Sequence, residues 1–153
     1  MADITTINGE QELRDAVGRH LGHSEWTEVT QEQVNLFADA TGDHQWIHVD
    51  QEKAAAGPFG GTIAHGYLTL SLVPLLRKQA WQVTGPKMGI NYGANKVRFP
   101  SPVRVGSRVR GGFEVTEVNQ TPAGYQVVEK VTVEIEGESK PALVAEVVTV
   151  MVF

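Results

Sequence analysis

An acid and an imidazole stand five residues apart in the run Thr41-Gly42-Asp43-His44-Gln45-Trp46-Ile47-His48, and a further histidine follows in Ala64-His65-Gly66. A carboxylate and an imidazole placed together can hold a water molecule and move protons to and from it. Because glycine commonly ends helices, Gly42 predicts that Asp43 and His48 both lie on a loop held by rigid flanks. The spacing therefore indicates a proton-transfer pair.

Capping patterns predict helices ahead of this pair. Asn8 with Gln11 three residues later resembles a capping box, and apolar residues at helical spacing then predict a helix near residues 9 to 20. Thr30 begins a second pattern of the same kind, and Gly42 ends it. Asp43 is therefore expected just past the end of a helix.

A long apolar segment follows the pair at about residues 64 to 81. Leucine and valine occupy every face of this segment, which predicts a helix buried in the core. Pro74 should kink the helix, since its ring removes one backbone hydrogen bond and crowds the preceding turn. Arg77 and Lys78 fall inside the segment, so a core helix is favoured over a membrane span.

The second half of the chain has the composition of β-strands. Strands are expected over residues 88–92, 96–99, 103–105, 107–118, 125–135 and 143–153, which are rich in Val, Ile, Phe and Tyr. Residues 125–135 alternate, so one face should meet the core. The last run is apolar on both faces except for Glu146 and Thr149, which suggests a central position or a partner sheet. Helices followed by antiparallel strands predict an α+β fold.

Length and composition set the class of protein. A chain of 153 residues is expected to form one domain over residues 1–153, and 41% hydrophobic with 20% charged residues is typical of a globular protein. The absence of cysteine excludes disulfides, thiol catalysis and thiolate metal sites. A net charge of −5 argues against broad nucleic-acid binding. The N-terminal residues lack a signal-peptide pattern, which favours a cytoplasmic location without membrane insertion.

The chain resembles the MaoC-like, R-specific enoyl-CoA hydratase family over roughly residues 30 to 115. The resembling residues are Thr41 to His48, Ala54, His65-Gly66, Val97-Arg98-Phe99-Pro100-Ser101-Pro102-Val103 and Val105-Gly106. Members of the family often carry asparagine and proline where this chain has Gln45 and Trp46. The acid and the imidazole keep their places.

This resemblance implies a hot-dog fold, in which a curved antiparallel sheet wraps around one long central helix. It also implies a lyase of fatty acid metabolism that acts on an acyl-CoA thioester, works as a homodimer and needs no metal or redox cofactor. In such an enzyme Asp43 and His48 activate water and shuttle protons, while the Gly66 backbone N–H stabilises the negative charge on the thioester oxygen. His65, Asn91 and Arg98 are expected to bind the substrate.

Other interpretations stay open beside this one. Asp43 and His48 can be purely structural, or can bind zinc together with His44, because imidazole and carboxylate are usual zinc ligands. The basic residues Lys96, Arg98, Arg104, Arg108 and Arg110 form either a solvated strand face or a site for coenzyme A phosphates. The alternative functions are a hot-dog thioesterase and a non-catalytic module that binds acyl thioesters.

Overall fold

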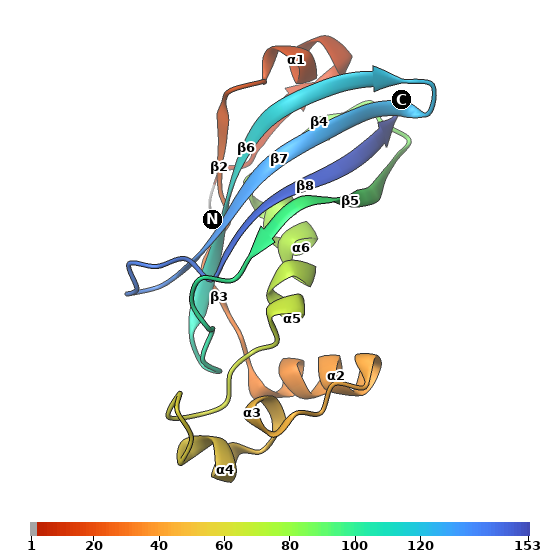
Figure 1. Cartoon of the computed structure of the whole chain (residues 1–153). Coiled ribbons are helices and arrows are strands. Elements are labelled where there is room, and N and C mark those ends of the chain that lie inside the picture. Colours follow the sequence, from red (N-terminus) through yellow and green to blue (C-terminus); the bar gives the residue numbers. More distant parts are fainter. Residues whose placement is uncertain (1–2) are drawn as a thin grey trace.

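The computed structural model describes residues 3 to 153, which form helices and strands in the order shown in Figure 1. The helices are α1 (Gly9–Asp15), α2 (Gln31–Thr41), α3 (Trp46–Val49), α4 (Gln51–Ala55), α5 (Gly66–Ser71) and α6 (Val73–Ala80). The strands are β1 (Thr5–Asn8), β2 (His20–His23), β3 (Thr27–Glu28), β4 (Trp81–Thr84), β5 (Met88–Arg98), β6 (Arg108–Thr121), β7 (Gly124–Ile135) and β8 (Leu143–Val152).

One curved sheet dominates the fold (Figure 1). Its strand order is β2-β6-β7-β8-β5, β3 pairs with β6 as well, and all of these pairs are antiparallel. Strand β8 lies between β7 and β5, which confirms the central position predicted from its two apolar faces. A small parallel pair, β1 with β4, stands apart from this sheet.

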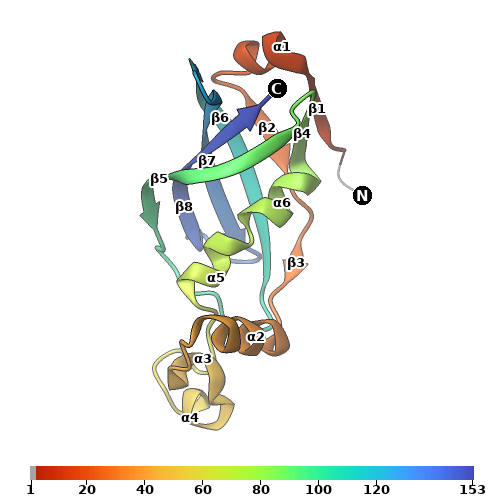
Figure 2. The same cartoon turned by 90° about the vertical axis from the view of Figure 1, so that its right-hand side faces the viewer.

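Helices α5 and α6 run along the inner side of the curved sheet (Figure 2). Leu68, Leu76 and other buried residues on one side of these helices pack with Phe113 of β6 in the hydrophobic core. Gly111 permits this close approach, because a Cβ atom there would lie 3.1 Å from the Cβ of Leu76. A curved antiparallel sheet around a central helix confirms the predicted α+β class and the hot-dog architecture.

The central helix departs from its prediction in two ways. It divides at Leu72, and Pro74 stands in the first turn of α6, where its missing N–H costs no helical hydrogen bond. The prediction that every face is buried was wrong, because Tyr67 is 71% exposed and Leu75 is 44% exposed. The outer side of the helix faces away from the curved sheet (Figure 2). Within the described part of the chain, no helix is both long and apolar enough to cross a membrane.

Three local predictions also need correction. The first helix ends at Asp15 rather than near residue 20, and its expected cap is replaced by a hydrogen bond from the Asn8 N–H to the Glu12 carboxylate. Residues 103–105 form no strand, because only an isolated bridge joins Arg104 to the chain at residue 63. The two strands expected over 88–92 and 96–99 are one strand, β5, whose register shifts around Asn91 where it pairs with β8.

Candidate active site

Asp43 is positioned by the end of α2. Thr30 caps the start of this helix by accepting a hydrogen bond from the Gln33 N–H, as predicted. Gly42 ends it in the left-handed conformation, with φ of 85°, which glycine adopts at no steric cost. Asp43 follows at once and accepts a hydrogen bond from the Gln45 N–H at 3.3 Å, so its carboxylate sits on an exposed turn.

His48 lies in the one-turn helix α3, not on the loop that the sequence predicted. Its side chain is buried, and its Nδ1 lies 2.7 Å from the carbonyl oxygen of Ile63. Because a carbonyl can only accept, the proton belongs on Nδ1 and the lone pair on Nε2. The ring nitrogen that can take a proton is therefore Nε2.

The surroundings of His48 favour its neutral form. Burial lowers the pKa of His48 below its ordinary value of 6.5, and the nearby His65 lowers it further. The hydrogen bond to Ile63 and the charge of Asp43 act in the opposite direction, but burial is the largest cause. A neutral imidazole at neutral pH is what a general base requires.

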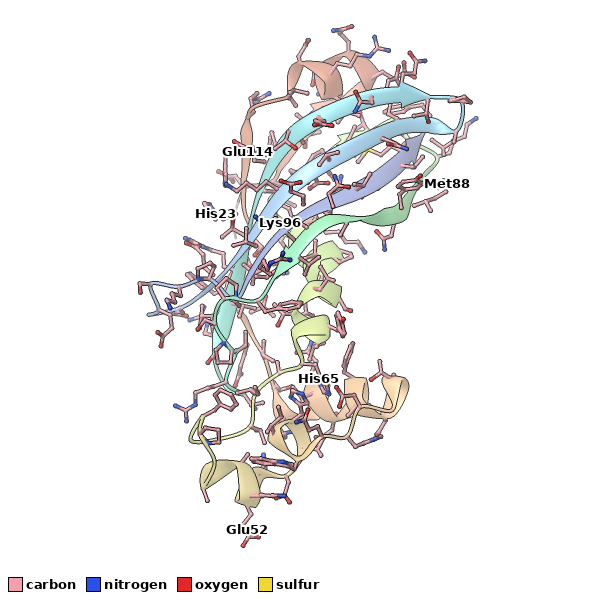
Figure 3. All side chains as sticks on the ribbon, in the orientation of Figure 1. His23, Glu52, His65, Met88, Lys96 and Glu114 are labelled. Atoms are coloured by element: carbon pink, nitrogen blue, oxygen red, sulfur yellow. The ribbon has the colours of Figure 1, made fainter. Side chains whose placement is uncertain are left out.

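His65 joins the two halves of the candidate site. Its Nε2–H donates to the carbonyl oxygen of Asp43 at 2.9 Å, and its ring stacks on the His48 ring with centroids 3.9 Å apart. The side chain is 2% exposed, and its Nδ1 is buried without a hydrogen-bond partner in the described structure. Figure 3 shows His65 at the junction between α5 and the helices α2 to α4.

Gly66 is the first residue of α5, directly after His65. Its N–H has no acceptor among residues 3 to 153, as expected for the first turn of a helix. A Cβ atom at this position would lie 3.1 Å from the ring of Phe99. The glycine therefore leaves an open backbone donor in a place where a side chain would have to displace an aromatic ring.

The zinc alternative takes a different form in the structure. His44 pairs with Asp39 at 2.9 Å on the exposed surface, so it does not accompany Asp43 and His48. His65 takes its place, and one ligand atom each of Asp43, His48 and His65 lie within 4.8 Å of one another. The His65 Nε2 and the His48 Nδ1 are both committed to backbone carbonyls. A metal-bound histidine commonly donates its other N–H to a carbonyl in the same way, so the zinc alternative stays open beside the proton-transfer pair.

A groove of about 630 Å³ lies between the helices α5 and α6 and the strand β5, and residues of β7 and β8 also line it. It begins near Leu70, one turn after Gly66, and Asn91 forms part of its wall. Trp46, the departure from the family pattern, packs against Gly57 and carries Lys53 over its ring at 4.7 Å, outside this groove.

Residues of the basic cluster differ in their contacts, and Arg104 donates to the Gly60 carbonyl oxygen at 3.0 Å. Arg108 and Arg110 form ion pairs with Glu136 and Glu134 at 3.2 Å and 2.8 Å, as on an ordinary solvated face. Arg98 instead donates to its own neighbouring carbonyl, is exposed, and forms no salt bridge in the described structure. Arg98 precedes Phe99, whose ring lies against Gly66, so it is the cluster member adjacent in sequence to the site.

Several residues of the site could not be found from the sequence. Gln31 donates to the His48 carbonyl oxygen at 2.8 Å and accepts from the Thr62 hydroxyl, so it links α2 to the segment before His65. The centroids of the Phe37 and His65 rings lie 4.9 Å apart, and the Phe99 ring covers Gly66. For Phe99 the signal was its place in the resembling block; Gln31 and Phe37 follow no pattern that sets them apart.

Comparisons with known proteins show the family and the fold. Residues 12–138 match the family described as MaoC like domain. The chain is 56% identical over 144 residues to 3-hydroxyacyl-thioester dehydratase Z of Mycobacterium tuberculosis, covering 94% of this chain and 95% of that protein. It is 51% identical over 140 residues to nodulation protein N of Rhizobium leguminosarum bv. viciae, covering 90% and 87% of the two chains. The unliganded R-hydratase PhaJ1 from Pseudomonas aeruginosa superposes with a TM-score of 0.71 at 25% identity, covering 89% of this chain and 81% of that one.

Proposed function

The chain belongs to the MaoC-like domain family, and we infer that it is a lyase that adds water to a trans-2-enoyl thioester or removes water from the 3-hydroxyacyl product. One observation supports this reaction above others. Ligand atoms of Asp43, His48 and His65 lie within 4.8 Å of one another, and Gly66, whose N–H is open, directly follows His65 at the start of α5. Water activation, proton delivery and charge stabilisation are the three functions that hydration requires.

In the proposed hydration, Asp43 and His48 hold the attacking water between them. The neutral His48 has its lone pair on Nε2, and one member of the pair takes a proton as the water oxygen bonds to the β carbon. The double-bond electrons move toward the thioester oxygen, where negative charge builds. The Gly66 N–H donates to that oxygen. A proton then returns to the α carbon from the same side, which gives the R-3-hydroxyacyl product.

His65 has a different proposed role from the substrate binding first expected of it. Its donor nitrogen is committed to the Asp43 carbonyl, and its ring supports His48. It therefore orients both catalytic residues rather than binding the substrate with its donor nitrogen. Asn91 lines the acyl groove, and Arg98 is the proposed contact for a coenzyme A phosphate, because arginine pairs well with phosphate oxygens.

We also propose that the protein is a homodimer. Strand β5 ends the sheet order and exposes apolar side chains along its length, among them Ile90 at 48%. Tyr67 and Leu75 expose further apolar surface on the adjoining helices. An unpaired edge beside an apolar patch favours association, and a second copy would cover both. The cytoplasmic location and the organisation of residues 1–153 as one domain remain predictions.

The test is a spectrophotometric assay with crotonyl-CoA and longer trans-2-enoyl-CoA esters. Loss of the enoyl absorbance with formation of the R product supports the proposal, and EDTA should leave the rate unchanged. Release of free thiol at the same rate would identify a thioesterase instead. Binding without turnover at every chain length would identify a non-catalytic module, and formation of S product would contradict the proposed geometry.

A further inference from the structure

The groove beside α5 and α6 continues into a second cavity. This second cavity, of about 240 Å³, adjoins the first, and Arg77, Lys78, Gly89 and Thr149 line both. Along the helices the lining runs from Leu70 through Arg77 to Trp81, the first residue of β4. Along β5 it runs in the opposite direction, toward Met88, which Figure 3 labels at one end of that strand. The two cavities therefore form one furrow with Arg77 at its division.

Arg77 is held firmly at this division. Its Nε donates to the Glu129 carboxylate at 3.0 Å, and its guanidinium carbon lies 4.0 Å from the centre of the Trp81 ring. Trp81 in turn donates its Nε1–H to the other oxygen of Glu129 at 3.1 Å. These three residues hold one another in a closed set of contacts, so the guanidinium is not a freely moving side chain.

Glu129 is the buried anchor of this set. Glu129 is 0% exposed, and its neighbours along β7 are mostly apolar. Its carboxyl group takes no part in the proposed proton transfer. Burial raises the pKa of the Glu129 carboxyl, whereas the charge of Arg77 and the hydrogen bond from Trp81 lower it. A buried carboxylate is retained at low cost only when it is paired and hydrogen-bonded, and both conditions are met here.

We propose that Arg77, clamped by Glu129 and Trp81, ends the acyl-binding part of the furrow and so limits the length of the acyl chain. The proposal rests on the proposed function, in which the thioester carbonyl lies at Gly66. Arg77 follows Gly66 by eleven residues, roughly 16 Å at about 1.5 Å per helical residue. Short and medium acyl chains end before that point. A long chain has to pass a guanidinium whose Nη2 is already buried without a hydrogen-bond partner among the described residues.

If the Arg77 guanidinium moves, it loses its hydrogen bond and ion pair with Glu129, and an apolar acyl chain cannot replace them. Displacing Arg77 separates it from Glu129 and leaves a buried carboxylate without its cation. The chain itself offers no hydrogen bond in return. The clamp therefore discriminates by length, because only a chain that reaches Arg77 meets this cost.

The experiment compares kcat/KM for trans-2-enoyl-CoA esters of four, eight and sixteen carbons. The wild-type protein should use the sixteen-carbon ester at least about tenfold less efficiently than the eight-carbon ester. Apolar pockets commonly discriminate between substrates of different size by a factor of this scale. Arg77→Met should raise the ratio of sixteen-carbon to eight-carbon efficiency by about tenfold, because it joins the two cavities. Since this variant leaves Glu129 unpaired, the double variant Arg77→Met/Glu129→Gln removes both charges and should show the same change of ratio in a folded protein.

Lys78→Met is the matched control. Lys78 is the adjacent cation on α6 and lines both cavities, but it is exposed and forms no ion pair in the described structure. It should keep the wild-type ratio. Equal wild-type efficiency with all three esters, an unchanged ratio in both Arg77 variants, or an equal change in Lys78→Met would overturn the proposal. Failure of the proposed function looks different, since no ester of any length would then be hydrated.

Discussion

The imidazole rings of His48 and His65 stack with their centroids 3.9 Å apart and 25° between their planes. Each ring also donates a hydrogen bond to a backbone carbonyl oxygen, His48 to that of Ile63 and His65 to that of Asp43. The stack therefore ties the two members of the proposed catalytic pair to one another through a third residue. A change at any one of the three should disturb the other two.

Removing either member of the pair should abolish most of the activity. Asp43→Asn and His48→Gln each keep the size of the side chain, and each should lower kcat by about a hundredfold or more, the scale of a general acid or base. Because both act on one water, the double variant should lose little more than either single variant. Steady-state kinetics with circular dichroism as the folding control tests this. Near-normal turnover in one single variant would remove that residue from the mechanism.

Activity should fall on the acid side through the titration of His48. Burial lowers its pKa below the ordinary 6.5, so the neutral form that accepts a proton persists at neutral pH and is lost only below that value. The unfolded chain binds this proton first as the pH falls, so the free energy of unfolding also decreases below about 6.5. Profiles of kcat/KM and of denaturant midpoint against pH measure both effects. His48→Gln should remove this component from the stability profile.

His65 should act on the rate through its neighbours. His65→Phe keeps an aromatic ring for stacking but loses the donor to the Asp43 carbonyl, and it should lower kcat by about tenfold through misplacement of Asp43. His65→Gln keeps an N–H and should recover part of that loss. Both variants remove one cause that lowers the pKa of His48, so the acid limb should move to higher pH. Unchanged kcat on the pH plateau in both variants would show that His65 does not position Asp43.

Gly66 is predicted to act through its backbone. Gly66→Pro removes the N–H at a helix position that tolerates proline, and it should cost about two orders of magnitude in kcat, the value of one oxyanion donor. Gly66→Ala keeps the donor but forces the Phe99 ring to move, because the new Cβ would lie 3.1 Å from it. Alanine should therefore mainly raise KM. Adding Phe99→Leu should relieve this, with Phe99→Leu alone as the control; a folded proline variant with full kcat would contradict the role.

Association should depend on β5. Ile90→Lys places a charge on its exposed apolar strip and should convert the dimer to a monomer by light scattering at micromolar concentration. Leu36→Lys is the matched control, because Leu36 is 62% exposed on α2, outside the proposed interface. It should leave the dimer intact. A wild-type monomer, or equal effects of the two changes, would count against the interface.

Local patterns in the sequence determined several of the helices and strands around the site. The cap at Thr30 and the stop at Gly42 located both ends of α2, since capping depends on residues within one turn. Alternation along residues 125–135 predicted which face of β7 is buried, because side chains alternate across a strand whatever its partner. The short offset between Asp43 and His48 indicated a proton-transfer pair, although His48 lies in the one-turn helix α3 and not on the expected loop.

Only the tertiary structure decided how these groups are presented. The carbonyl of Ile63 selects which nitrogen of His48 is free, and His65 rather than His44 completes the cluster. Arg77 meets Glu129 across 52 residues of chain. The central helix leaves one side exposed, although its sequence is apolar all round. Each of these outcomes depends on which distant segments pack together, and no pattern within one helical turn or one strand specifies that.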